Sequence, residues 1–233
     1  MNPLHLLRAA LLRDISPADV RHNLDDIHPY IPGDDYRHID WNATARTGEL
    51  YSRIPYREKS LTLATIVDTS TSMHVGKHRS LLAAAEETRR MWSCIAGPED
   101  RYIHISERDI PSAVAFANVK LPQGTALLVI SDCHNFSPCM VGTSKRLACT
   151  LLLARDPWYN DFPLRGFHRV RDIETGASRR MFFGHQEGER YRRAAQNREK
   201  TILKNFTIAG WRTGILTEDN SPNALFFLVS SPA

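Results

Sequence analysis

Residues 61–73 read Leu-Thr-Leu-Ala-Thr-Ile-Val-Asp-Thr-Ser-Thr-Ser-Met, and this stretch decides the fold. Its first seven residues are apolar or β-branched, which is typical of a strand that is buried on both faces. One carboxylate and two hydroxyls follow at alternate positions, at Asp68, Ser70 and Ser72. Open α/β sheets bind ligands at the carboxyl ends of their strands. The stretch therefore predicts an inner strand that ends in a ligand site.

The rest of the chain alternates segments of strand and helix character. Predicted strands lie at residues 101–105, 126–131, 147–154 and 213–217, and predicted helices at residues 77–94, 111–119, 186–206 and 222–228. Buried strands that alternate with helices indicate a parallel sheet with crossover connections. We therefore predict an α/β fold with a doubly wound, mostly parallel sheet. Residues 168–172 and 180–183 are predicted to form a separate hairpin.

The first sixty residues differ in character from the remainder. Residues 4–13 predict an amphipathic helix. Residues 49–56 alternate apolar and polar side chains, and Pro55 restricts the predicted strand to a sheet edge. We therefore divide the chain into an N-terminal extension over residues 1–60 and a sheet domain over residues 61–233.

Composition limits the classes of function. The formal net charge is +4, from 30 basic and 26 acidic residues, and this excess is too small to indicate nucleic acid by itself. The four cysteines show no CxxC spacing, as expected for reduced thiols in the cytosol. Residues 4–13 are too short to span a bilayer, and they contain Arg8. We expect a cytoplasmic protein that neither binds nucleic acid nor spans a membrane.

The residue types at the end of the predicted strand indicate a divalent cation, because hydroxyl and carboxylate oxygens suit Mg²⁺ or Mn²⁺. The pattern Asp-x-Ser-x-Ser after a buried strand resembles the metal-ion-dependent adhesion site (MIDAS) of von Willebrand factor A domains. That resemblance implies a metal held by Asp68, Ser70, Ser72 and Asp132. It further implies that an acidic residue of a partner fills the open position on the metal.

The completing ligand stays open at this point. The adhesion-type pattern implies a Thr on the loop after a neighbouring strand, but residues 106–111 contain none. Ser106 can substitute for it, or Asp109 can supply a carboxylate instead. The competing interpretation is that Ser70 and Ser72 only cap the following helix.

A second pattern, Tyr-Ile-Pro-Gly-Asp-Asp-Tyr-Arg-His-Ile-Asp-Trp-Asn-Ala-Thr-Ala-Arg-Thr-Gly, occupies residues 30–48. With the strand end, and with matches at residues 130–132, 155–157 and 171–176, it resembles the domain of unknown function 58 family. These are bacterial proteins whose core is von Willebrand A-like. Charge-assisted hydrogen bonds are expected to pin this segment to the sheet domain, the alternative being a catalytic or metal cluster. Its structural or interaction residues are Gly33, Asp34, Asp35, Arg37, Asp40, Trp41 and Arg46.

The family resemblance also implies a function. It implies a non-enzymatic adaptor for a MoxR-type AAA+ ATPase and a client protein, in a chaperone-like or complex-maturation system. The sequence contains no Gly-rich phosphate loop, Ser-His-Asp elbow or HExxH pair, and we assign no catalytic residue. Two alternatives stay open: a metal-dependent hydrolase that uses Asp68 and Asp132, and a scaffold whose metal site is vestigial.

Overall fold

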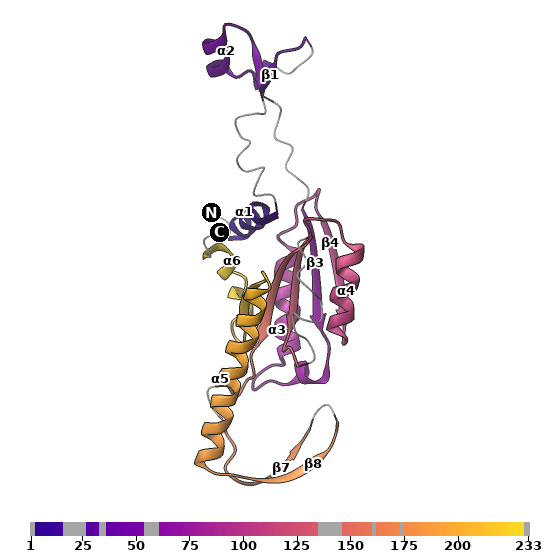
Figure 1. The fold of residues 1–233 in the computed structure, drawn as a ribbon, viewed down its shortest axis with the longest axis vertical. Coiled ribbons are helices and arrows are strands. Elements are labelled where there is room, and N and C mark those ends of the chain that lie inside the picture. Colours follow the sequence, from indigo (N-terminus) through magenta and orange to yellow (C-terminus); the bar gives the residue numbers. More distant parts are fainter. Residues whose placement is uncertain are drawn as a thin grey trace.

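The structure, a computed structural model, describes residues 3–15, 27–32, 36–53, 61–134, 146–159, 162–172 and 175–230. Five strands form a parallel sheet in the order β4-β3-β5-β6-β9 (Figure 1). They are β3 (Thr62–Asp68), β4 (Arg101–Glu107), β5 (Ala126–Ser131), β6 (Ala148–Ala154) and β9 (Arg212–Leu216). The winding reverses between β3 and β5, as in doubly wound sheets. The predicted α/β fold with a doubly wound parallel sheet is confirmed.

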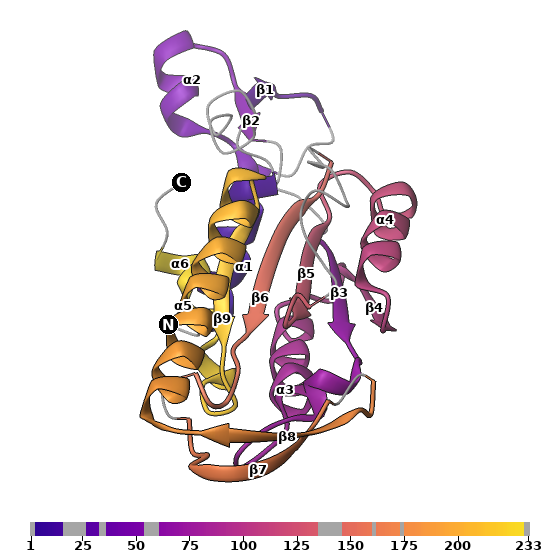
Figure 2. The same cartoon turned by 60° about the horizontal axis from the view of Figure 1, so that its bottom comes forward.

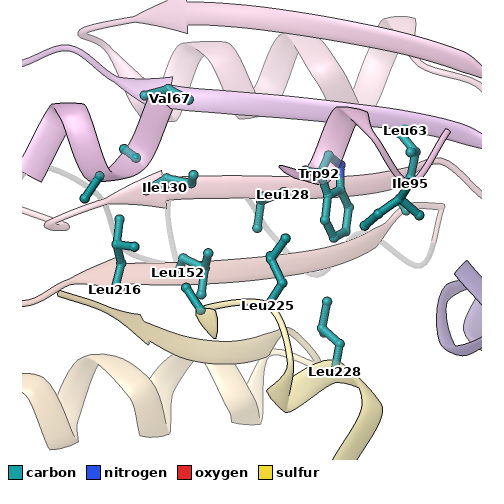
Figure 3. Close-up of a cluster of buried hydrophobic side chains, with 14 of the residues drawn as sticks. Leu63, Val67, Trp92, Ile95, Leu128, Ile130, Leu152, Leu216, Leu225 and Leu228 are labelled. Atoms are coloured by element: carbon teal, nitrogen blue, oxygen red, sulfur yellow. The ribbon is translucent and has the colours of Figure 1, made fainter. Parts of the chain in front are cut away.

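Helices cover both faces of this sheet. Successive side chains of a strand point to opposite faces, so Leu63 and Val67 contribute to one buried cluster while Ala64 and Ile66 contribute to another. The first face is covered by α1 (Pro3–Ile15), α3 (Leu81–Ser93) and α6 (Phe227–Ser230), and the second by α4 (Ile110–Lys120) and α5 (His185–Ile208). Figure 3 shows the first cluster, with the Trp92 indole from α3 lying over the strands.

Helix α1 packs onto the sheet domain, although it belongs to the predicted extension. Leu7 and Leu11 are 0% and 2% exposed and lie in the first core cluster. The Arg8 guanidinium forms an ion pair with the Asp100 carboxylate at the start of β4. The division at residue 60 stays a prediction. No helix within the described residues has both the length and the apolarity to cross a membrane.

The second part of the extension is a small unit of its own (Figure 1). Strand β1 (Ile27–Pro29) pairs antiparallel with β2 (Tyr51–Arg53), and η2 (Tyr36–His38) and α2 (Trp41–Thr47) lie between them in the chain. Asp40 begins α2, because its carboxylate accepts hydrogen bonds from the amides of Asn42 and Ala43. The predicted strand at 49–56 is thus observed as β2, and residues 54–60 lie outside the described part of the chain.

Helix α3 begins at Leu81, not at the predicted residue 77. The Glu218 carboxylate accepts hydrogen bonds from the amides of Lys77 and His78, which holds this segment outside the helix. The Ser80 hydroxyl then accepts from the amide of Ala83 and caps α3. The predicted last helix, residues 222–228, is divided into η5 (Ser221–Asn223) and α6.

The predicted hairpin is confirmed as β7 (Gly166–Arg171) paired antiparallel with β8 (Ser178–Phe183). At its turn, the Asp172 carboxylate accepts from the amide of Thr175, and Gly176 has a φ of 72°. Figure 2 shows the hairpin on the side of the sheet toward which the carboxyl ends of the strands point.

Candidate functional site

Asp68 is held at the carboxyl edge of the sheet by hydrogen bonds to both of its carboxylate oxygens. Val67 and Ile130 are partners in the register of β3 and β5, so Asp68 and Ser131 end adjacent strands. The Asp68 Oδ1 atom accepts from the amide of Ser70 at 2.8 Å, and Oδ2 accepts from the Ser131 hydroxyl at 2.6 Å. Asp68 is only 4% exposed, so these two bonds compensate the cost of burying its carboxylate.

The hydroxyls of Ser70 and Ser72 lie 3.0 Å apart. Ser70 precedes the short helix η3 (Thr71–His74), but its side chain makes no capping hydrogen bond. The cap of α3 is Ser80 instead. The interpretation of Ser70 as a side-chain helix cap is therefore wrong, and its hydroxyl is directed at Ser72.

The spacing of this pair fits a hard divalent cation. Mg²⁺ binds oxygens at about 2.0–2.1 Å in octahedral geometry, which puts two neighbouring ligands about 2.9 Å apart. The two serine hydroxyls have nearly that separation, and the Asp68 carboxylate lies beside them. In the described part of the chain, no three His, Cys, Asp or Glu side chains gather as a metal cluster. A cation at this edge would therefore depend on hydroxyl ligands.

Asp132 follows β5 on a turn with an unusual backbone. The next residue, Cys133, has a φ of 56°, a left-handed conformation that costs energy for a residue with a side chain. Its amide donates to the Ser131 hydroxyl at 2.9 Å. The amide of His134 donates to Asp132 Oδ1 at 3.1 Å, and Arg198 of α5 donates to the Asp132 carbonyl at 3.0 Å. Three hydrogen bonds thus fix the turn that presents Asp132.

The environment of Cys133 also excludes a reactive thiol at this turn. Burial, and then the neighbouring Asp132 carboxylate, raise the pKa of the Cys133 thiol to about 12. A thiol with this pKa stays protonated near neutral pH, so it is a poor nucleophile.

The two predicted completing ligands both have local partners. The Ser106 hydroxyl lies 2.9 Å from Nε2 of His104, on the same strand. The Asp109 carboxylate accepts from the hydroxyl of Ser112 in α4. In the register of β3 and β4, Glu107 is the residue opposite Asp68. The structure does not join Ser106 or Asp109 to Asp68 by any described hydrogen bond, and their role as ligands stays a prediction.

A cavity of about 280 Å³ lies beside Asp132, between the ends of β5 and β6 and helix α5. Arg155 forms a two-pronged ion pair with Glu199, at 2.7 and 2.9 Å, and its guanidinium lies 4.5 Å from the centre of the Tyr159 ring. The Asp156 carboxylate accepts from the hydroxyl of Tyr191. Burial, and then this bond, raise the pKa of the Tyr191 hydroxyl. The wall of the cavity is thus a set of paired charges that ties the end of β6 to α5.

Sequence reasoning singled out residues 155–157 but missed their partners on α5. Glu199 and Tyr191 lie more than thirty residues downstream, in a helix whose charged residues are typical of a solvated surface. Ser131 was also missed as a partner of Asp68. The only signal was its place in the Ile-Ser-Asp match at residues 130–132.

The residues of the N-terminal pattern show mixed roles. Asp40 caps α2 within its own unit, and Arg46 lies in the last turn of that helix. The guanidinium of Arg37 lies 5.9 Å from the centre of the Tyr36 ring, and Trp41 is 67% exposed. Gly33, Asp34 and Asp35 fall outside the described residues, so the predicted pinning of this segment to the sheet domain stays a prediction.

Comparison with known proteins gives one family. Residues 26–96 match the model of the family described as Protein of unknown function DUF58. The matched segment is less than half of the chain, and it contains both the N-terminal pattern and the strand end with Asp68, Ser70 and Ser72. The match supports the resemblance to this family. No curated protein and no solved structure matches the chain.

Proposed function

We propose that this chain is a non-enzymatic protein-interaction module that holds Mg²⁺ or Mn²⁺ at its carboxyl edge and captures an acidic residue of a partner. The observation that carries the proposal is the 3.0 Å separation of the Ser70 and Ser72 hydroxyls beside Asp68. This group lies where the winding of the sheet reverses, the position at which doubly wound sheets bind their ligands.

The serine hydroxyls and the aspartate carboxylates of the site have different roles in this proposal. Ser70 and Ser72 are neutral, so a cation bound to both keeps most of its charge and attracts a carboxylate from outside. Asp68 already accepts hydrogen bonds at both oxygens, and we assign it a contact to the metal through water. Asp132, fixed on the next strand, is assigned the same role. The arrangement corresponds to an adhesion-type site of the von Willebrand A kind.

This assignment favours binding over hydrolysis. A hydrolase that used Asp68 would need a carboxylate oxygen turned toward a substrate or an attacking water. Asp68 is instead 4% exposed, and its carboxylate accepts from the Ser131 hydroxyl and the Ser70 amide, so little of it is accessible to a substrate. The resemblance to this family implies a further proposal, that the partner is a MoxR-type AAA+ ATPase acting with a client protein in the cytoplasm.

Calorimetric titration of Mg²⁺ and Mn²⁺ into four proteins tests the metal site. They are the wild type, Asp68→Ala, the double variant Ser70→Ala/Ser72→Ala, and the control Ser93→Ala. We expect saturable binding to the wild type and the control only. We also expect a metal-dependent rise in melting temperature, because a ligand that binds only the folded state stabilises it.

Three results would count against the proposal. If the wild type and the double serine variant bound the metal equally, Ser70 and Ser72 would not be its ligands. Turnover of generic phosphoester or ester substrates that is lost in Asp68→Ala would favour the hydrolase alternative. Failure of all four proteins to bind either metal at millimolar concentration would leave the fold intact and refute a metal site formed by this chain alone.

A further inference from the structure

The hairpin of β7 and β8 exposes one face that its own folding does not explain. Cross-strand partners point to the same side of a hairpin, so the register defines this face. Phe167 lies opposite Phe182, with ring centres 5.0 Å apart, and Arg169 lies opposite Arg180. Phe167 is 82% exposed and Phe182 is 55% exposed. We call these four residues the Phe-Arg face.

The opposite face provides the anchoring of the hairpin. Phe183 is 8% exposed and packs on Phe162, with ring centres 5.2 Å apart, and Phe162 packs in turn on Tyr191 of α5. An isolated two-stranded ribbon is at best marginally stable in water, so this contact is where the hairpin gains its stability. The Phe-Arg face is not needed for it.

The Phe-Arg face is also unfavourable in the isolated chain. Like charges directly opposite one another destabilise an antiparallel pair. Arg169 and Arg180 form such a pair. Among the described residues, no carboxylate forms an ion pair with either guanidinium. An anionic partner would relieve this repulsion while covering the two phenylalanine rings.

Three features favour a protein partner over a nucleic acid or a membrane. Protein interfaces are enriched in aromatic residues, Met and Arg and depleted in Lys, and β7 and β8 have this composition without a single Lys. The adjoining helix α5 carries Glu187 and Glu189 among its arginines, so no continuous cationic track extends from the hairpin. The hairpin also lies on the side of the sheet toward which the carboxyl ends of the strands point (Figures 1 and 2), and Asp68 is the last residue of β3.

We propose that the Phe-Arg face binds an acidic protein segment that carries an apolar side chain two positions from a carboxylate. The phenylalanine pair and the arginine pair are two residues apart along each strand, or about 7 Å. An extended segment that repeats the pattern apolar-x-acidic-x places its apolar and acidic side chains on one face with this same spacing. This inference rests on the protein-interaction part of the proposed function, but it does not require the metal.

Fluorescence anisotropy with a labelled peptide of Phe-Ser-Glu-Ser repeats tests this inference, with EDTA present to remove any bound metal. Arg169→Glu/Arg180→Glu and Phe167→Ser/Phe182→Ser should each weaken binding about tenfold or more. Arg101→Glu, at the opposite end of the sheet, and Phe116→Ser, with the same 55% exposure as Phe182, are the matched controls. Circular dichroism melts verify that each variant is folded.

Each outcome bears on the inference. Loss of binding in the hairpin variants alone supports it, even if the metal titration fails. Unchanged binding in those variants overturns it, even if the metal binds, and equal losses in the controls overturn it as a general charge effect. Tighter, hairpin-dependent binding of an oligothymidylate or of phosphatidylglycerol vesicles would also overturn it. A peptide of Glu-Ser repeats must bind more weakly than the Phe-Ser-Glu-Ser peptide, because otherwise the phenylalanines are not part of the surface.

Discussion

Replacing Ser131 by alanine is the sharpest test of how the carboxyl edge is built. Ser131 is 1% exposed, and its single hydroxyl serves two buried groups. It donates to Asp68 Oδ2 at 2.6 Å and accepts from the amide of Cys133 at 2.9 Å. The substitution removes both bonds but leaves only a small void. Its effect therefore measures hydrogen bonding much more than packing.

The expected loss follows from the two bonds. A hydrogen bond to a charged group contributes about 1.5–3 kcal/mol, and a buried amide left without a partner costs about 1–3 kcal/mol. Because both effects depend on one hydroxyl, they are not independent, and we expect the free energy of unfolding to fall by about 2–4 kcal/mol. Less stable anchoring of Asp68 should also weaken Mg²⁺ binding by about tenfold or more, as for other residues that orient a ligand.

Urea denaturation followed by tryptophan fluorescence measures the stability, with Ser93→Ala as the control. The Ser93 hydroxyl donates to the Arg90 carbonyl near the end of α3, and its loss should change stability by no more than about 0.5 kcal/mol. A double-mutant cycle with Asp68→Ala isolates the bond between Ser131 and Asp68. A loss below about 1 kcal/mol in Ser131→Ala, or a coupling energy near zero, would refute the reasoning.

Two further predictions concern the other end of the sheet. Burial tends to raise the pKa of Asp100, but hydrogen bonds from the amides of Gly97 and Leu61 and from the Arg8 guanidinium lower it overall. The stability this carboxylate provides is therefore complete above its ordinary pKa, near 3.8, and is lost as the pH falls through the lower folded value. Urea melts of Asp100→Asn should then show a shallower decline of stability below about pH 4 than the wild type. Leu7→Ala should cost about 2–5 kcal/mol in the same assay, because this side chain is fully buried against the sheet domain, while the more exposed Leu6→Ala should cost far less.

The sheet could be predicted well because its strands carry a strong local signal. The run at residues 126–131 is wholly buried in the structure, and its predicted bounds are the observed bounds of β5. The start of α3 could not be predicted, because Glu218 holds Lys77 and His78 from a position about 140 residues away. The periodicity of the sequence contains no information about such a contact. Errors in predicted helix boundaries come from contacts of this kind, whereas the type of each element depends on the local pattern.

In the candidate site, too, local features could be predicted from the sequence and long-range contacts could not. Asp68, Ser70 and Ser72 are within five residues, and a turn after a strand must bring their side chains close together, so the sequence was sufficient to predict the group. The contact of Asp68 with Ser131 spans 63 positions and depends on which strands are neighbours. The order of strands in a sheet is a property of the packed structure, and no residue type in the chain specifies it.

The strand order explains why segments scattered along the sequence form one surface. In a parallel sheet every strand ends at the same edge, so a group that follows any strand lies near the groups that follow its neighbours. Asp68 ends β3, Asp132 follows β5, and Arg155 follows β6, and these three strands are adjacent. Arg198 of α5 then joins the carbonyl of Asp132 to the wall of the cavity that contains Arg155. Disruption of the Arg155–Glu199 pair should therefore affect the proposed metal site through α5 and the turn at Cys133. The exposed Trp41 in the N-terminal unit has no such connection to the site through the described contacts.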